Sequence, residues 1–221
     1  MLADREMWFA APDQWQDPHE AWWCKHLFRD KSHLASAYAY GTCWTRRWLD
    51  EPFWRIYGCK CKDDASGGSK PRVKAMPAVR FKANTRALLE WLRASVAGKA
   101  AKAYMGRVRY CPYEQLKHEA TRVRATADGA SPVAATGLHL KRLAFRFEDE
   151  VRMLWIDRSG KRPGHALPFD PVTLFDQVMI GPVRDEHLDR YSFVEARLID
   201  LGIPPGRIVP SRLFHPPSIP T

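Results

Sequence analysis

The last third of the chain contains two apolar segments separated by an amphipathic one. "LFDQVMIGP" and "GRIVPSRLF" have the composition of strands, and "DEHLDRYSFVEARLIDLG" between them repeats apolar residues at helical spacing. A strand, a helix and a strand with short joints form a crossover unit, so the two strands are expected to be parallel neighbours. The chain must therefore build a sheet against which helices pack.

Earlier segments alternate between strand and helix patterns. We expect strands at 7–9, 35–45, 79–81, 104–113 and 143–156, and helices at 50–58 and 84–98. A further helix begins at Asp17, the N-cap, with Pro18 at its first position and Glu20 completing the cap. Residues 59–71 read as a mobile loop, 121–137 as a mobile connection and 157–171 as a turn and loop. The sequence predicts an α+β fold: one domain over residues 1–221, with a mixed, mostly antiparallel sheet of about seven strands covered by helices.

The composition is that of a globular protein without a membrane span. Hydrophobic residues make up 45% of the 221 residues, yet no apolar run approaches the ~20 residues that a bilayer requires. The N-terminus lacks the basic-then-apolar order of a secretion signal. The five cysteines are odd in number and show no framework spacing, which indicates a reducing compartment. We expect a cytoplasmic protein.

The excess positive charge lies in the middle third of the chain. Residues 60–124 hold sixteen Lys and Arg against five Asp and Glu, while the flanking thirds are nearly neutral. Such an excess favours nucleic acid, nucleotide phosphates or an acidic protein surface, although it also suits a face that only keeps the protein soluble. The residues that would contact phosphates are Arg72, Lys74, Arg80, Lys82, Arg107 and Arg109.

The stretch "FEDEVRMLW" places charges within an apolar strand pattern. On a strand, Glu148, Glu150 and Arg152 share one face. One carboxylate could stay ionised while the other serves as acid or base, and the guanidinium could bind the pair or a substrate phosphate. Two alternatives remain: a ladder of exposed ion pairs, or a pair of magnesium ligands in a nuclease.

Other cofactor motifs are missing from the sequence. Cys59 and Cys61 form a Cys-x-Cys pair, but no second pair follows at zinc spacing, so we predict no metal site on these residues. "GGSK" at 67–70 lacks the glycine spacing and the preceding strand of a phosphate-binding loop.

Several phrases, taken in order, resemble the bacterial family called domain of unknown function 2971. They are "MWFAAPDQWQDPHE", "YGTCWT", "FWRIYG", "KRLAFRFEDEVR" and "VMIGPVRDEHLDRYSFVEARLIDLGIPPGRIVPSRL". The likeness spans nearly the whole chain. It departs where the family's Asn-Asp-Pro-Phe reads Gln-Asp-Pro-His, and the family's opening Tyr-x-Tyr strand has no counterpart before Leu2.

The resemblance implies a site at Glu148, Glu150 and Arg152, with companions Asp17, Trp44, Trp54, Tyr57 and Lys141. It supplies no reaction. Our leading hypothesis is an enzyme acting on a nucleotide or nucleic acid, in bacterial (phage) defence or as a toxin, and more specifically ADP-ribosyl transfer from NAD. One glutamate would stabilise the ribosyl cation and the other would orient the acceptor, while Arg152 or Lys141 would hold the pyrophosphate and Trp44 or Tyr57 would stack on nicotinamide. The alternative is a non-catalytic nucleic-acid-binding or regulatory module.

Overall fold

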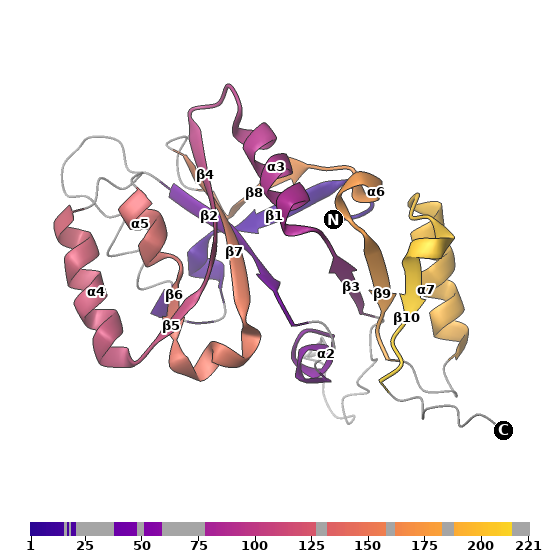
Figure 1. The fold of residues 1–221 in the computed structure, drawn as a ribbon. Coiled ribbons are helices and arrows are strands. Elements are labelled where there is room, and N and C mark those ends of the chain that lie inside the picture. Colours follow the sequence, from indigo (N-terminus) through magenta and orange to yellow (C-terminus); the bar gives the residue numbers. More distant parts are fainter. Residues whose placement is uncertain are drawn as a thin grey trace, which may run out of the picture. The chain divides into compact units, whose positions relative to one another are not determined.

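The computed structural model describes residues 1–15, 17, 19–20, 38–47, 51–58, 78–126, 132–157, 162–182 and 188–213. The chain forms two compact units (Figure 1). Unit 1 contains Met1 and residues 3–48 and 89–169, and unit 2 contains Leu2 and residues 49–88 and 170–221. Both combine helices with strands, so the α+β class is confirmed, but the strands divide among three sheets. The expected mobile loop 59–71 lies outside the described residues, and the single domain stays a prediction.

Unit 1 is built on a five-stranded antiparallel sheet with the order β4-β7-β2-β1-β8. Its strands are β1 (Glu6–Ala10), β2 (Tyr38–Thr45), β4 (Ala101–Arg107), β7 (Glu150–Asp157) and β8 (Gly164–Pro168). β1 and β2 confirm predicted strands, and β4 covers the first part of the strand predicted at 104–113. The expectation of only turn and loop over 157–171 is wrong, because "GHALP" pairs with β1 as an edge strand. The sequence pattern missed this strand because it is short and ends in proline. Both features are typical of edge strands.

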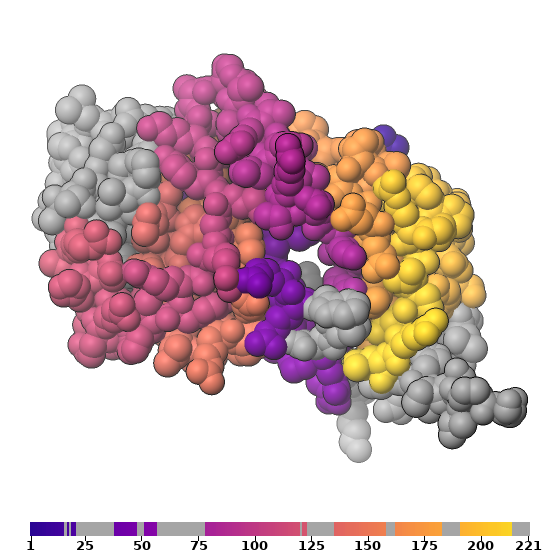
Figure 2. Space-filling model, in the orientation of Figure 1, coloured from indigo at the N-terminus to yellow at the C-terminus, as the bar shows by residue number. Residues whose placement is uncertain are grey.

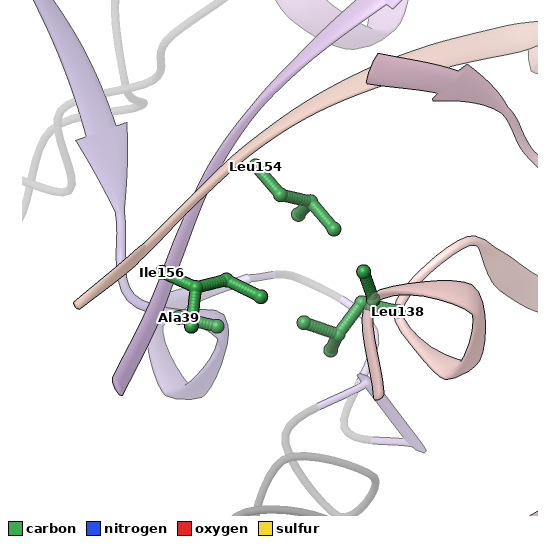
Figure 3. Close-up of a cluster of buried hydrophobic side chains, with 5 residues drawn as sticks. Ala39, Leu138, Leu154 and Ile156 are labelled. Carbon is green, nitrogen blue, oxygen red and sulfur yellow. The ribbon is translucent and has the colours of Figure 1, made fainter. Parts of the chain in front are cut away.

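One face of this sheet packs on a short helix. Ala39 of β2 and Leu154 and Ile156 of β7 form a buried cluster with Ala135 and Leu138, as Figure 3 shows for four of them. Trp15, which follows the 3-10 helix η1 (Pro12–Gln14), and Tyr104 complete this cluster.

The opposite face of the sheet is covered in part by α3 (Thr85–Val96), a predicted helix. The Trp91 ring lies 6.2 Å from that of Phe9, and its indole N–H donates to the Pro168 carbonyl at 3.0 Å. Gly98 follows the helix with a φ of 71°, the left-handed conformation expected of a helix-ending glycine.

A second, two-stranded parallel sheet completes unit 1. It pairs β5 (Arg109–Cys111) with β6 (Leu140–Arg142), and α4 (Tyr113–Thr126) and α5 (Pro132–Gly137) lie between them in the chain. The mobile connection predicted for 121–137 is therefore wrong wherever that range is described. Its short Ala and Gly side chains gave no periodic pattern, but Ala135 is buried in the cluster of Figure 3.

Unit 2 holds a three-stranded sheet with the order β10-β9-β3. β9 (Gln177–Ile180) runs parallel to β10 (Ile208–Pro210), which confirms the predicted crossover, and β3 (Val79–Lys82) is antiparallel to β9. α7 (Leu188–Asp200) packs Tyr191, Val194 and Leu198 against the sheet, whereas Ile199 is exposed. The remaining helices of this unit are α2 (Glu51–Gly58), as predicted, α6 (Pro171–Leu174) and the 3-10 helix η4 (Pro205–Arg207).

None of the helices that the structure describes is long and apolar enough to cross a lipid bilayer.

Candidate functional site

Strand β7 holds the two charged residues at the centre of the site. Glu150 and Arg152 lie on the same face as Leu154 and Ile156, as strand alternation requires. Groups packed on this face, Trp15 and Glu20 among them, cover the charged side chains, and Arg152 is only 1% exposed. A ladder of exposed ion pairs does not fit this burial.

The segment before β7 differs from the predicted strand. Leu143–Glu148 forms the 3-10 helix η2, and Asp149 adopts a left-handed conformation with a φ of 41°, so the strand begins at Glu150. Aspartate is among the few residues that tolerate this conformation. The three acids still alternate in burial, although only Glu150 belongs to the strand: Glu148 and Glu150 are buried, while Asp149 is partly exposed.

Arg152 uses all three of its guanidinium nitrogens within the cluster. Nε donates to Glu150 Oε1 at 2.7 Å, Nη2 donates to Glu20 Oε1 at 2.6 Å, and Nη1 donates to the Leu138 carbonyl at 2.6 Å. The Trp15 ring lies against the guanidinium, 4.3 Å from its carbon. Since this guanidinium is buried and committed to protein partners, the structure does not fit the predicted role of Arg152 as a pyrophosphate ligand.

Lys141 of β6 joins the two buried glutamates. Its ammonium donates to Glu148 Oε2 at 2.6 Å and to Glu150 Oε2 at 3.2 Å, and it lies 4.9 Å from the centre of the Phe145 ring. It thus stands between the carboxylates that the nuclease alternative would use to hold magnesium. Among the described residues, no three His, Cys, Asp or Glu side chains are grouped so as to hold a metal ion.

Neutral groups complete the surroundings of the acids. The Tyr110 hydroxyl accepts from the Glu150 backbone N–H at 2.8 Å, and the Thr45 hydroxyl donates to the Glu148 carbonyl at 2.6 Å. The Cys43 thiol donates a hydrogen bond to the Glu150 carboxylate. As a residue Cys43 is exposed, unlike the charged residues beside it, but its thiol, which faces Glu150, is buried.

The phrase "DPHE" brings two more buried acids to this region. Asp17 acts as the predicted N-cap, since its carboxylate accepts from the His19 backbone N–H at 3.0 Å. It also forms a paired hydrogen bond with Arg142, at 2.9 and 3.1 Å. Glu20 was expected to complete the cap, but its carboxylate binds Arg152 instead. The helix that these residues begin continues outside the described residues.

Burial and charge shift the pKa values of the two acids bound to Arg152 in opposite directions. Burial raises the pKa of Glu20, although the Arg152 and Lys141 charges oppose it. Burial also opposes ionisation of Glu150, but the charges and hydrogen bonds of Arg152, Lys141 and Cys43 outweigh it and lower its pKa to about 2. The difference arises because Glu150 binds both cations and Glu20 binds one.

Three further groups beside these acids have shifted pKa values. Burial lowers the pKa of the Lys141 ammonium, but the charges of Glu20, Glu150 and Glu148 outweigh it, so the pKa is raised overall. Burial raises the pKa of Tyr110 to about 12. Burial also raises the pKa of the Cys43 thiol well above its ordinary value, with the Glu150 charge adding to the effect. The thiol of Cys43 is therefore poorly ionised.

We call the five residues Glu20, Lys141, Glu148, Glu150 and Arg152 the buried ion cluster. When all five are ionised, three carboxylates face two cations, which leaves one negative charge in excess. This excess is a cost of burial, and it would be relieved by a proton or by a bound cation.

Among the predicted aromatic companions, Trp44 does not join the buried ion cluster. Trp44 pairs with Val151 on β2 and β7, so its side chain lies on the sheet face opposite Glu150 and Arg152. Trp54 belongs to unit 2, where its ring packs closely against Gly181. The backbone of Tyr57 also lies in α2 of unit 2, and its side chain is outside the described residues.

The predicted phosphate-binding residues are divided between the units. Arg107 and Arg109 belong to unit 1 and are exposed, as the alternation around buried Val108 predicted. Arg80 and Lys82 belong to β3 of unit 2, and burial lowers the pKa of Arg80. Arg72 and Lys74 lie outside the described residues.

Sequence reasoning missed four residues of the site: Glu20, Cys43, Tyr110 and Trp15. Trp15, Glu20 and Cys43 stand inside phrases that carry the family resemblance, so that resemblance could have marked them. Tyr110 gave no comparable signal, because an aromatic residue in an apolar segment is typical of a core.

Comparison with family models, with curated proteins and with solved structures finds no match to this chain. The likeness to domain of unknown function 2971 therefore stays a prediction.

Proposed function

We propose that unit 1 is an enzyme that breaks the glycosidic bond of a nucleotide at the buried ion cluster, and that its reaction is ADP-ribosyl transfer from NAD. The observation that carries the proposal is geometric: two buried carboxylates, those of Glu20 and Glu150, meet at one guanidinium. Both bind the guanidinium of Arg152, yet the pKa of one is raised and that of the other is lowered. Acid–base catalysts commonly show such opposed shifts.

Each carboxylate suits one part of this reaction. Glu150 stays ionised and would stabilise the positive charge that develops on the ribose as the bond to nicotinamide breaks. Nicotinamide leaves with the electron pair of that bond, and the acceptor forms a new bond to the same ribose carbon. Glu20, the more basic carboxylate, would take the proton that the acceptor loses.

The charge of the cluster supports a cationic transition state. Its excess negative charge favours the nicotinamide ring of NAD, which is positive before cleavage, and the ribosyl cation that follows. The reacting groups would approach Glu150 from the side of Cys43, whose residue is exposed although its thiol is buried. Phosphates would bind outside the cluster, since Arg152 and Lys141 are committed to the glutamates.

The biological role that follows is toxicity or defence in a bacterial cytoplasm. Consumption of NAD or modification of nucleic acid would stop growth of a cell. Within the described residues, Cys43 and Cys111 are free thiols, which suits a reducing compartment. Growth arrest on expression of wild type, relieved by Glu150→Gln at equal protein level, is the expected result.

The biochemical test measures nicotinamide released from NAD in the presence of water, protein and nucleic-acid acceptors. Wild type should release nicotinamide, and Glu150→Gln and Glu20→Gln should lose most of this activity. Asp200→Asn, which removes an exposed carboxylate of α7, is the matched control and should stay active. Circular dichroism of each variant separates loss of chemistry from loss of fold. An inactive, folded wild type, or a Glu150→Gln variant as active as wild type, would refute the proposal.

A further inference from the structure

Unit 1 has five exposed arginines near Asp149 and Glu119, and four of them pair with these two carboxylates. We call Arg46, Arg107, Arg109, Arg122 and Arg146 the arginine arc. Asp149 pairs with Arg46 at 3.9 Å and with Arg107 at 3.3 Å. Glu119 pairs with Arg109 at 3.0 Å and with Arg122 at 2.8 Å. Each acid is thus shared by two guanidiniums, so the arc keeps a net positive charge.

Backbone connections link four of the five arginines of the arc. Arg107 ends β4 and Arg109 begins β5, and the buried Val108 between them makes both side chains project to the same, outer side. Arg46 is fixed to the same turn by its backbone N–H, which donates to the Asp149 carbonyl at 3.0 Å. Arg146 belongs to η2, and its carbonyl accepts from the Asp149 N–H at 3.4 Å. Figure 2 shows this segment of the chain at the molecular surface.

The carboxylates hold the guanidiniums in place while leaving them open to solvent. Arg107 is 68% exposed in its side chain, and Arg109 and Arg122 are about half exposed. A guanidinium fixed by one acid loses less conformational entropy when it binds a ligand than a free side chain does. Its remaining N–H groups can still donate to an anion.

From these contacts we infer that the arginine arc binds the phosphodiester backbone of a nucleic acid. All five cations are arginines, whose planar forks match phosphate oxygens in pairs. Phe147, next to Arg146, is an exposed aromatic ring on which a base could stack. A series of cations with an adjacent ring suits a chain of phosphates and bases better than the irregular carboxylates of an acidic protein.

The position of the arc also bears on the proposed reaction. Asp149, which holds the arc, lies between Glu148 and Glu150 of the buried ion cluster, and the Val108 N–H donates to the Glu150 carbonyl at 2.9 Å. Through Asp149 the arc adjoins the cluster in the chain, but Arg107 pairs with Val151 and its side chain lies on the sheet face opposite Glu150. Nucleic acid as the acceptor of ADP-ribose rests on the proposed function, but binding to the arc does not.

The test is fluorescence anisotropy with short labelled single-stranded DNA, single-stranded RNA and duplex DNA, between about 50 and 200 mM salt. Wild type should bind at least one of them, with affinity that falls steeply as salt rises. Arg107→Gln with Arg109→Gln should weaken binding at least about tenfold and lower the salt slope by about two, one for each lost phosphate contact. The control pair, Arg55→Gln with Arg197→Gln, removes two equally exposed, ion-paired arginines of unit 2 and should bind like wild type.

Three results would overturn the inference. They are an affinity that does not change with salt, an equal loss in the control pair, and displacement of the oligonucleotide by an acidic peptide at the same charge concentration, which would indicate a protein partner. The arc variants should still release nicotinamide when water is the acceptor. Oligonucleotide binding without any NAD turnover would leave the arc intact and remove only the proposed reaction.

Discussion

Arg152 and Glu20 are 132 residues apart in the chain, and a 2.6 Å hydrogen bond joins them in the interior of unit 1. This bond ties the phrase "DPHE" to the central strand. It also brings Glu20, whose pKa is raised by burial, to the same guanidinium as Glu150, whose pKa is lowered.

Glu20→Gln should cost less stability than Glu150→Gln. Burial disfavours the ionised form of Glu20, and a neutral amide can still accept from Arg152 and leaves two carboxylates facing two cations. Glu150→Gln leaves Arg152 and Lys141 without their shared carboxylate, a loss of about 3 kcal/mol or more. Urea unfolding at neutral pH gives both free energies. Equal losses of unfolding free energy in the two variants would contradict this prediction.

Acid should narrow the stability gap between wild type and Glu150→Gln. The pKa of Glu150 is about 2 in the folded protein against 4.5 ordinarily, so its contribution is complete above about 4.5 and lost as the pH falls toward 2. That contribution is about 3 kcal/mol. The pKa of Glu20 is raised in the folded protein, so the folded protein binds this proton more readily than the unfolded chain does. Protonation of Glu20 therefore stabilises the fold as the pH falls, which is opposite to the effect of Glu150. Unfolding free energies measured at several pH values check this, and a constant gap would contradict it.

Gly41→Ala should displace the indole that covers Arg152. A Cβ at position 41 would lie 2.7 Å from the Trp15 ring and 3.2 Å from Leu154. The expected loss is about 1–3 kcal/mol, measured by thermal unfolding together with tryptophan fluorescence. Gly206→Ala is the control, because no heavy atom lies within 4 Å of its added Cβ. A Gly41→Ala variant as stable as the control would show that Trp15 moves without cost.

Cys43 should react slowly with iodoacetamide at neutral pH although it is exposed. Burial of the thiol and the nearby Glu150 charge raise its pKa, so little thiolate is present. Peptide mass mapping follows this cysteine separately from the others. Glu150→Gln should label faster, because the carboxylate that accepts from the thiol is gone. Rapid labelling of wild-type Cys43 at neutral pH would refute this account.

Elements with a strong period could be predicted from the sequence, and those fixed by distant partners could not. The crossover of β9, α7 and β10 was predicted because both strands and the helix show their own spacing. The 3-10 helix before Glu150 was missed, since a left-handed aspartate leaves no trace in an alternating pattern. Glu20 looked like part of a helix cap, and only tertiary structure brings it to Arg152.

The buried ion cluster also imposes an order of assembly on unit 1. Lys141, Glu148 and Glu150 lie within ten positions of one another, so their bonds can form as soon as that segment leaves the ribosome. The bonds from Asp17 and Glu20 span more than 120 positions, and closing so long a loop is slow. During synthesis Asp17 can pair only after Arg142 has been made, and Glu20 only after Arg152 has been made. A truncation that stops before Glu150 would therefore leave Glu20 without its ionic partner.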